Sequence, residues 1–535
     1  MQKAVDHPMN ERYDALVVGA GMAGLTAAAY LAKAGYSVQI CERSEKPGGL
    51  VADFRRGGIH FDAGLRAVEN SGVIRPMLND LGIEMDFLPN PVSIRIGERI
   101  VRLTEGGLDA YGDMLKSLFP ENVGDVAAIQ AEIRRVMEIM DVLYGIDNPL
   151  FVDFKKDPKY LLHTLLPWLV RYQRSMRRVG QFQMPVEAHL AKLTQNRALI
   201  DMIAQHFFRD TPGFFALSYF GLYLDYLYPK GGTGALARKM ADFIREHGGE
   251  IDCKTEIARI DPHQRVACTA EGRNIGYRTL IWAADQKAFY RALGNSPDAS
   301  RAFQAQTEKV ARGRGGDSVL SVFLSLDLVP EVIHQAFGAH CFYTPATQGL
   351  SSLGVDGWIR LSDSRKRDLA AWIRRFLAWT TFEISCPVLR DASLAPEGRT
   401  GLIVSTLFPI DLVRTIARAG WYSEFEALCL EAVLAQLDQA LPGIGAAVTD
   451  SSCASPLTIE KRTGNTDGAI TGWAFGEAMP AESRLPKIAR SVRTPVPHIF
   501  QAGQWTFSPS GLPVSILTGR LAADASARTL RRKRP

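Results

Sequence analysis

The stretch from Tyr13 to Gly24 reads YDALVVGAGMAG and decides the fold of this chain. A short apolar run ends in three glycines with the spacing GxGxxG. The Ala- and Leu-rich segment Leu25–Ala34 predicts a helix, and the apolar segment Ser37–Cys41 predicts a second strand. Strand, glycine turn, helix and strand in this order predict a βαβ unit. We therefore expect an α/β protein that contains a Rossmann-type dinucleotide-binding domain.

Each glycine of the turn has a physical task in such a unit. Gly19 permits the tight turn, Gly21 lets the backbone approach a pyrophosphate, and Gly24 lets the helix pack closely on the strand. Ala23 lies in the same turn and belongs to the predicted site. The start of the helix offers unpaired N–H groups to an anion. Glu42 follows Gly24 by 18 residues, near the spacing of about 20 expected for an acidic residue that binds ribose hydroxyls.

The residues after Glu42 favour FAD over NAD as the dinucleotide. Arg43 follows at once, then the pair Gly48-Gly49, and then the segment Phe61–Gly64, which reads FDAG. A GG pair alone is more often an ordinary turn. Two glycines just after the acidic residue, however, let the chain pass close under a second phosphate and a ribityl chain. The combination predicts an FAD site.

These motifs resemble those of the flavin amine oxidase and phytoene desaturase superfamily. Further segments are similar to its phytoene desaturase, carotenoid isomerase and retinol saturase branch, and they span essentially the full length. They are Tyr228–Leu236 (YPKGGTGAL), Glu256-Ile257, Ile281–Asp285 (IWAAD), Pro456–Gly464 with Gly468–Trp473, Gln501–Trp505 (QAGQW), Gly511–Pro513 (GLP) and Gly519–Ala523 (GRLAA).

The resemblance implies a set of FAD contacts beyond the glycine turn. It places the strand at Ile257 against the adenine and the AG turn at Gly503 against the ribityl chain and phosphate. It also places the loop before Pro513 in front of a helix that points at the isoalloxazine. The predicted cofactor residues are Gly19, Gly21, Ala23, Gly24, Glu42, Arg43, Gly48, Gly49, Leu50, Gly64, Leu65, Arg66, Ile257, Ala284, Gly503, Gln504, Pro513 and Val514.

The order of these segments predicts a discontinuous domain organisation. Residues 1–75, 220–295 and 486–535 form the FAD-binding domain in this scheme. Residues 76–219 and 296–485 form an inserted α+β substrate domain, with amphipathic helices expected at Val123–Leu143 and Pro185–Phe208. A chain of 535 residues exceeds what one core usually supports, which fits two such parts.

Composition limits the classes of partner. The net charge of +5 is too mild over this length to predict nucleic-acid binding. The seven cysteines are scattered without a CxxC pair, so we expect neither a disulfide framework nor a metal site. No apolar run reaches about 18 residues, so we expect no transmembrane helix and a cytoplasmic protein.

One segment suggests contact with a membrane surface. Within residues 155–180, the apolar stretch Tyr160–Val170 contains Trp168, is interrupted by Pro167, and precedes Arg171, Arg174, Arg177 and Arg178. Apolar and aromatic residues beside cations are typical of peripheral attachment, here to the inner face of the membrane. An ordinary helical hairpin within the substrate domain explains the apolar part equally well.

The chemistry expected of the site is hydride transfer at N5 of the flavin. The resemblance implies a long apolar, isoprenoid-like substrate, and the electron acceptor or donor is open. Leu165, Leu166, Phe207, Phe208, Phe214 and Phe215 are candidates for an apolar tunnel or for plain core. Arg66 and Glu69 stand where carotenoid desaturases usually carry small apolar residues. They are candidate catalytic residues or an internal salt bridge, and Trp505 either covers the flavin or belongs to the core.

Three functions remain open at this point. The preferred one is an FAD-dependent oxidoreductase that desaturates, saturates or isomerises C=C bonds in a carotenoid, retinoid or related isoprenoid lipid. A flavin amine oxidase is the second, and it would need an aromatic cage around a polar pocket. A flavin-binding subunit without catalytic activity is the third.

Overall fold

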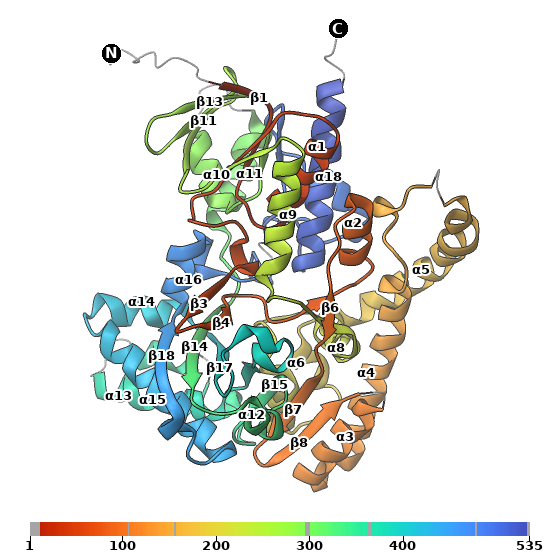
Figure 1. Cartoon of the computed structure of the whole chain (residues 1–535). Coiled ribbons are helices and arrows are strands. Elements are labelled where there is room, and N and C mark those ends of the chain that lie inside the picture. The colour runs from red at the N-terminus through yellow and green to blue at the C-terminus, as the bar shows by residue number, and fades with distance from the viewer. Residues whose placement is uncertain are drawn as a thin grey trace.

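The computed structural model describes residues 11–104, 106–154, 157–294, 300–354, 356–361, 366–476 and 479–531. Predictions on the remaining positions, such as residues 155 and 156 of the suggested membrane segment, lie outside the described residues. Two seven-stranded sheets organise the chain, one in the upper and one in the lower half of Figure 1. The α/β character predicted from the glycine motif is confirmed.

The upper sheet has the order β10-β2-β1-β13-β12-β11, with β19 beside β13. Its strands β10, β2, β1, β13 and β19 run parallel, as a βαβ unit requires. The strands are β1 (Glu11–Val18), β2 (Val38–Cys41), β10 (Glu250–Asp252), β11 (Ile257–Asp261), β12 (Val266–Thr269), β13 (Asn274–Trp282) and β19 (Ile499–Gln501). They come from three separated stretches inside the predicted FAD-domain ranges, and the domain boundaries themselves stay a prediction.

Three helices from those same stretches pack together beside this sheet: α1 (Met22–Lys33), α9 (Gly234–Glu246) and α18 (Leu512–Arg531) (Figure 1). The alanines of α1 let its neighbours approach closely. A Cβ atom added at Gly519 would overlap the carbonyl oxygen of Ala23, so α18 needs a glycine where it crosses α1. The last helix of the chain is thereby held against the first.

The lower sheet has the order β18-β14-β17-β16-β15-β7-β8. Its strands are β7 (Val92–Ile96), β8 (Arg99–Leu103), β14 (Ser318–Leu326), β15 (His340–Thr344), β16 (Phe382–Ser385), β17 (Thr400–Phe408) and β18 (Val448–Ala454). Side chains alternate between the faces of a strand. Cys341, Tyr343 and Ile384 join the core with α13 (Lys366–Trp379), α14 (Ile410–Arg418) and α15 (Tyr422–Ala440). His340, Phe342 and Glu383 face the opposite way, into a cavity.

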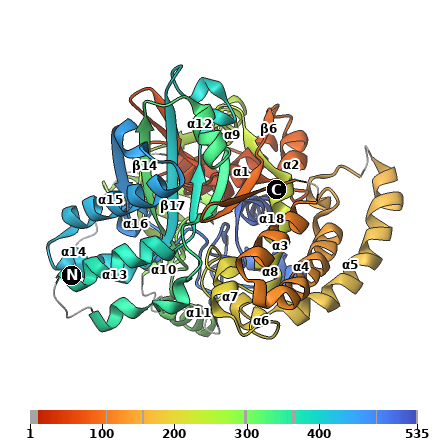
Figure 2. The same cartoon turned by 90° about the horizontal axis from the view of Figure 1, so that it is seen from below.

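A helical region continues beyond β7 and β8. Its main helices are α3 (Gly107–Leu118), α4 (Val123–Tyr144), α5 (Leu166–Val179), α6 (Val186–Leu190), α7 (Arg197–Ala204) and α8 (Gly213–Leu222). Figures 1 and 2 both place α5 at the periphery, on the side away from α13 and α15. Smaller elements are β3 (Asp53–Arg56), β4 (Ile59–Asp62), β5 (Val68–Glu69), β6 (Phe87–Pro89), β9 (Tyr226–Pro229), α2 (Ile74–Leu81), α10 (Gln286–Leu293), α11 (Arg301–Arg312), α12 (Pro330–Ala336), α16 (Pro456–Thr463) and α17 (Ile488–Ser491).

Two helix predictions need correction. The helix expected at Val123–Leu143 is confirmed as α4, but the single helix expected at Pro185–Phe208 is wrong. Two helices, α6 and α7, occupy that range, because the Asn196 side chain accepts the amide of Leu199 at 3.3 Å and starts a new helix. Pro167 does not interrupt its segment either: a π-helical turn at Tyr160–Leu165 runs directly into α5 and accommodates the missing N–H.

A buried carboxylate joins the FDAG and PKGG segments. Asp62, at the end of β4, accepts hydrogen bonds from the Thr233 amide (3.0 Å), the Thr233 hydroxyl (2.8 Å) and the Tyr228 hydroxyl (2.9 Å). Burial alone would raise the pKa of Asp62, but the hydrogen bond from His60, the charge of Arg390 and the Thr233 amide together lower it. This carboxylate ties the turn before α9 to the hairpin of β3 and β4.

Candidate active site

One cavity of about 850 Å³ extends from the glycine turn of the upper sheet to the inner face of the lower sheet. Fifteen of the eighteen predicted cofactor residues line it, as do Glu69 and Trp505. The three that do not are Gly24, Pro513 and Val514, whose neighbours Ala23, Leu512 and Ser515 line it instead. The structure thus brings the predicted residues together, while their role as cofactor ligands stays a prediction.

The glycine turn has the geometry of an anion site. Gly19 has a φ of +97°, and a Cβ atom there would lie 2.9 Å from the Ala283 carbonyl oxygen. A Cβ atom at Gly24 would overlap the Gly19 carbonyl oxygen, so Gly24 serves packing. Gly21 has open space beside it and gives α1 no side-chain cap, so first-turn amides are free to bind an anion.

The GG pair lies directly on this turn. The amide of Gly48 donates to the Ala20 carbonyl at 2.8 Å, and Gly21 forms a β-bridge with Gly48. A Cβ atom at Gly49 would lie 3.3 Å from the Cα of Gly21. Both glycines have positive φ values, which a side chain would disfavour. Two backbone segments therefore meet without side chains, as a pyrophosphate cradle requires.

Glu42 and Arg43 hold the cradle together. The Glu42 carboxylate accepts the amides of Ala20 (2.7 Å) and Ser44 (2.8 Å), and it retains further lone pairs for ribose hydroxyls. The Arg43 guanidinium donates to the Lys461 carbonyl at 3.1 Å, at the end of α16. Arg43 therefore links the acidic end of β2 to a segment more than 400 positions away in the chain.

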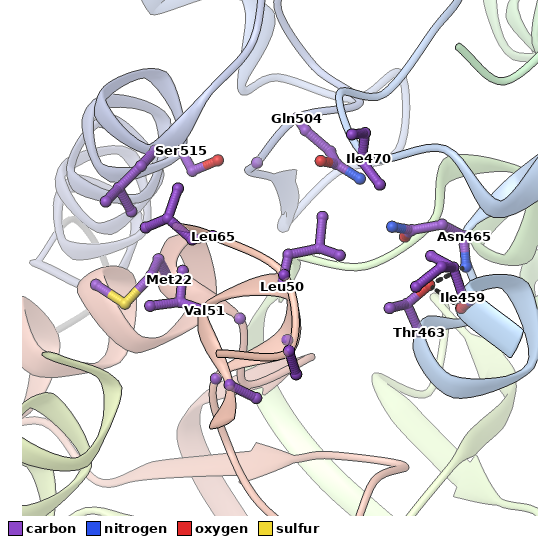
Figure 3. Close-up of a pocket in the computed structure, with 18 of the residues that line it drawn as sticks. Met22, Leu50, Val51, Leu65, Ile459, Thr463, Asn465, Ile470, Gln504 and Ser515 are labelled. Carbon is purple, nitrogen blue, oxygen red and sulfur yellow. Dashed lines mark hydrogen bonds between the residues drawn. The ribbon is translucent and has the colours of Figure 1, made fainter. Parts of the chain in front are cut away.

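The end of α16 supplies cavity residues that the sequence analysis did not assign. Ile459, Thr463 and Asn465 line the cavity, with Ile470 nearby. Figure 3 shows them opposite Leu50 and Leu65, with Gln504 at the top of the view and Ser515 beside Leu65. The segment Pro456–Gly464 had been noted for its family resemblance, so the signal was present but no contact was derived from it.

The C-terminal motif closes the cradle from the other side. The Ala502 amide donates to the Trp282 carbonyl at 2.9 Å, and the Gly503 amide donates to the Thr518 hydroxyl at 2.9 Å. Trp505 lines the cavity, but its side chain is buried and packs on Trp473 with ring centroids 4.7 Å apart. This arrangement favours a packing role for Trp505, and a catalytic role stays a prediction.

Arg66 and Glu69 do not form the internal salt bridge considered as an alternative. The Arg66 guanidinium donates to the Asp62 carbonyl and, at 3.3 Å, to the Ser405 hydroxyl. No other residue of the described ranges forms a hydrogen bond with the Glu69 side chain, which is largely buried and lines the cavity. Burial raises the pKa of Glu69 to about 7, so near neutral pH this carboxyl group exists in both protonation states.

Aromatic side chains form the far part of the cavity. Of the six tunnel candidates from the sequence, Phe207 and Phe208 line it, while Leu165, Leu166, Phe214 and Phe215 are not among its lining residues. The aromatic wall was otherwise missed. It consists of His206, Tyr219, Tyr223, Tyr226 and Phe342. Burial lowers the pKa of His206 to about 3, so this ring is neutral and joins the aromatic surface.

A polar chain ends in this aromatic part and was also missed. The Arg390 guanidinium donates to the Asn90 side-chain oxygen at 3.0 Å, and because arginine only donates, the Asn90 amide nitrogen faces Nδ1 of His340 at 3.2 Å. Nε2 of His340 consequently carries the proton and donates to Glu383 at 3.0 Å. Burial alone would raise the pKa of Glu383, but this hydrogen bond and the neighbouring charges lower it, so Glu383 stays ionised.

The comparisons with known proteins agree with this geometry. A profile for the family described as flavin containing amine oxidoreductase matches residues 22–525. The chain is 23% identical over 519 residues to a phytoene dehydrogenase of Streptomyces griseus, covering 95% of this chain and 94% of that protein. It is 22% identical to a chloroplastic prolycopene isomerase of Daucus carota (84% and 70% covered). It is 23% identical to an all-trans-retinol 13,14-reductase of Macaca fascicularis (96% and 85% covered). These relatives confirm the resemblance inferred from the motifs.

Solved structures share the fold at low identity. A cyclohexylamine oxidase from Brevibacterium oxydans aligns with a TM-score of 0.60 and 14% identity, covering 97% of this chain and all of that one. An oxidoreductase from Methanosarcina mazei aligns with a TM-score of 0.59 and 14% identity, covering 96% and 99%. In addition, no helix within the described ranges is long and apolar enough to cross a membrane.

Proposed function

Because this chain belongs to the flavin containing amine oxidoreductase family, we propose that it desaturates, saturates or isomerises a C=C bond of an isoprenoid lipid. It is an FAD-dependent oxidoreductase, and the alternative of a flavin-binding subunit without catalytic activity is set aside. The relatives named for phytoene, prolycopene and retinol support an apolar isoprenoid as the substrate.

The observation that carries this proposal is the continuity of the cavity. One end is built from glycines and backbone amides and fits the phosphates and ribose of FAD. The other end is walled by aromatic rings, and an elongated apolar molecule there would place a carbon–carbon bond between the two ends. Tyr219, Tyr223 and Phe342 offer a surface on which a polyene packs favourably.

The residues of the chain have separate roles in the proposed reaction. Formation or loss of a C=C bond needs a hydride and a proton at adjacent carbons, and bound FAD supplies the hydride chemistry at its N5. Glu69 is the group best placed to hold the proton, because its carboxyl faces the cavity with a pKa near 7. Arg66 fixes the neighbouring loop through the Asp62 carbonyl and Ser405, and the buried walls keep bulk water away.

An amine oxidase is the second candidate, favoured by the aromatic wall around Glu383 and by structural neighbours named as amine oxidases. The charges argue against it, because Arg66 and Arg390 already compensate the carboxylate. A protonated amine would gain little at a carboxylate whose charge is already compensated.

A single incubation distinguishes the two. FAD-loaded protein, once with oxidised and once with dithionite-reduced flavin, would be kept without oxygen, in turn with phytoene, retinol and a primary alkylamine, while flavin absorbance is followed. Organic extracts would then be examined by mass spectrometry. We expect a change of 2 Da, or a new isomer of unchanged mass, in an isoprenoid. Flavin bleaching by the amine alone would replace our proposal with the amine oxidase.

We also propose peripheral contact with a membrane through α5. The exposed apolar side chains of α5 and of the π-helical turn Tyr160–Leu165 before it recur at helical spacing, and Leu162 in the turn and Val170 in α5 are 61% and 55% exposed. The remaining members of this apolar face are Leu161, Leu166 and Leu169. The helix continues into Arg171, Arg174, Arg177 and Arg178. Apolar residues beside arginines suit the boundary between acyl chains and anionic headgroups.

The position of α5 relative to the cavity supports this contact. Burial raises the pKa of Tyr144, the last residue of α4, and the nearby Glu69 and Tyr172 of α5 add to this rise. Trp168 packs on Tyr172 with ring centroids 4.7 Å apart. A lipid leaving the bilayer at α5 would therefore have a short aromatic path to the cavity.

A further inference from the structure

The far end of the cavity contains a carboxylate that a hydrocarbon cannot satisfy. Glu383 lies in the middle of the lower sheet on β16, and its side chain is 35% exposed because it borders the cavity. One oxygen accepts the His340 N–H at 3.0 Å. No donor within the described part of the chain reaches the other oxygen.

His340 holds this carboxylate in one orientation. Its imidazole is fixed between Asn90 and Glu383, and Asn90 is fixed by Arg390. Arg390 in turn donates to the Ser385 hydroxyl at 2.6 Å and lies 4.1 Å above the ring of Tyr228. The donor or acceptor role of each atom that links Arg390, Asn90, His340 and Glu383 is fixed, so the free oxygen of Glu383 is an acceptor presented to the cavity.

Tyr226 forms the wall of the cavity beside His340 and Glu383. Its ring stacks on His340 with centroids 5.7 Å apart, and it faces Glu69 across the pairing of β5 and β9. The cavity thus offers a preoriented acceptor within aromatic walls. A purely hydrocarbon chain seated there would exclude water from Glu383 without replacing its hydrogen bond, which is unfavourable.

We propose that Glu383, oriented by His340 and flanked by Tyr226, binds a hydroxyl group at one end of the isoprenoid substrate. This inference rests on the function proposed above and narrows its substrate class to oxygenated isoprenoids. A hydroxyl donates one hydrogen bond and brings no charge, which suits a carboxylate already balanced by Arg66 and Arg390. Glu383 is then the specificity-determining residue, and His340 and Asn90 are positioning residues.

Binding to the FAD-loaded protein tests this inference. The probes are geranylgeraniol, its methyl ether and geranylgeranylamine, with the quenching of flavin fluorescence as the readout. The ether keeps the oxygen of the alcohol and carries a methyl group in place of the donor hydrogen. We expect the alcohol to bind about tenfold to a hundredfold more tightly than the ether, the range for a hydrogen bond to a charged group. This comparison in the unaltered protein depends on no variant.

Two variants locate the effect. In Glu383→Gln we expect the preference for the alcohol to fall to about fivefold or less, as for a neutral hydrogen bond. Glu69→Gln, which makes the same change at a carboxylate that lines the cavity beside Tyr226, should keep the full preference. Loss of the preference in Glu69→Gln but not in Glu383→Gln would overturn the assignment.

The outcomes separate this inference from the proposed function. Equal binding of alcohol and ether would overturn the hydroxyl site and leave the isoprenoid function standing. Tighter binding of the amine than of the alcohol would overturn it in favour of a cation site. If none of the three chains binds, the isoprenoid function and the hydroxyl site both fall.

Discussion

The two ends of the cavity are built in different ways. The FAD end is made of backbone: glycines at 19, 21, 48, 49 and 503 and the amides around them. The far end is made of side chains from neighbouring strands of the lower sheet, from helix α8 and from the segments that flank it. In the function proposed above, the first end recognises phosphate and ribose through groups that every residue carries. The second end is proposed to recognise the substrate through side chains that single substitutions can replace.

The largest expected effect comes from removing the buried carboxylate of Asp62, which ties the turn before α9 to the hairpin of β3 and β4. Asp62→Ala leaves the Thr233 amide, the Thr233 hydroxyl and the Tyr228 hydroxyl without their acceptor. We expect the free energy of unfolding to fall by about 3–5 kcal/mol, the usual range for breaking a buried charged network. Denaturant unfolding at pH 7 measures it. A loss below about 1 kcal/mol would contradict the role given to Asp62.

The pH dependence of that loss has a definite sign. The pKa of Asp62 is lower in the folded chain than in the unfolded one, so its contribution is present above the ordinary aspartate pKa of about 4. It is lost as the pH falls through the lower folded value. The difference between the parent and Asp62→Ala should therefore narrow in acid. Asp450→Ala, at an exposed carboxylate paired with Arg56, is the matched control and should change little.

A second pair of variants separates folding from binding within the FAD end. Gly24→Ala forces a Cβ atom onto the Gly19 carbonyl, and we expect a loss of roughly 2–4 kcal/mol in the free energy of unfolding. Gly21→Ala meets open space and an extended backbone, so the FAD-free protein should keep its stability. Its FAD affinity should nevertheless fall roughly tenfold or more, because the Cβ atom occupies the approach to the pyrophosphate. Equal destabilisation by both changes would contradict this division.

A smaller effect concerns the proton on Glu69. Its folded pKa of about 7 lies above the usual value of 4.5, so the folded chain holds a proton that the unfolded chain releases between these values. Stability therefore falls as the pH rises through this window. Glu69→Gln should match the parent near pH 5 and exceed it at pH 8 by on the order of 2 kcal/mol. A difference that does not vary with pH would contradict a shifted Glu69.

The smallest effect on stability is expected on the exposed apolar face formed by α5 and the π-helical turn before it. Changing Leu162 and Val170 to Asp should alter the free energy of unfolding by less than about 0.5 kcal/mol, because both side chains are exposed. Flotation with vesicles that contain anionic lipid should nevertheless show severalfold weaker binding. Val329→Asp, at an exposed apolar residue beside α12, is the matched control. If the doubly substituted protein floats with the vesicles as well as the parent does, the proposed membrane contact is contradicted.

The glycine-rich end of the cavity could be predicted from the sequence because the backbone conformation of each turn depends on residues close together in the chain. A glycine is required wherever a backbone turns or approaches another backbone, and Gly19, Gly21, Gly48 and Gly49 report such places directly. Glu42 stands at a fixed spacing after them for the same reason. The helical segment Pro185–Phe208 was predicted wrongly because Asn196 acts as a cap there, and no periodicity reveals that.

The far end could not be predicted because its residues are ordinary ones taken singly. His340 and Glu383 lie 43 positions apart in two strands, and Asn90 precedes a third. Only the pairing of β15 with β16 and β7 brings them together. Arg66 and Glu69 were found because they follow the FDAG motif, yet their separate partners depend on the folded chain.

The alternation of side chains in the lower sheet has a consequence for how such enzymes diversify. His340 and Phe342 of β15 and Glu383 of β16 border the cavity, while Cys341, Tyr343 and Ile384 on the opposite face belong to the core packed with α13 and α15. Substitutions confined to the first set can retune which molecule is accepted and leave the scaffold intact. Related proteins with this sheet could therefore change their substrate specificity by single substitutions while the nucleotide-binding residues stay the same.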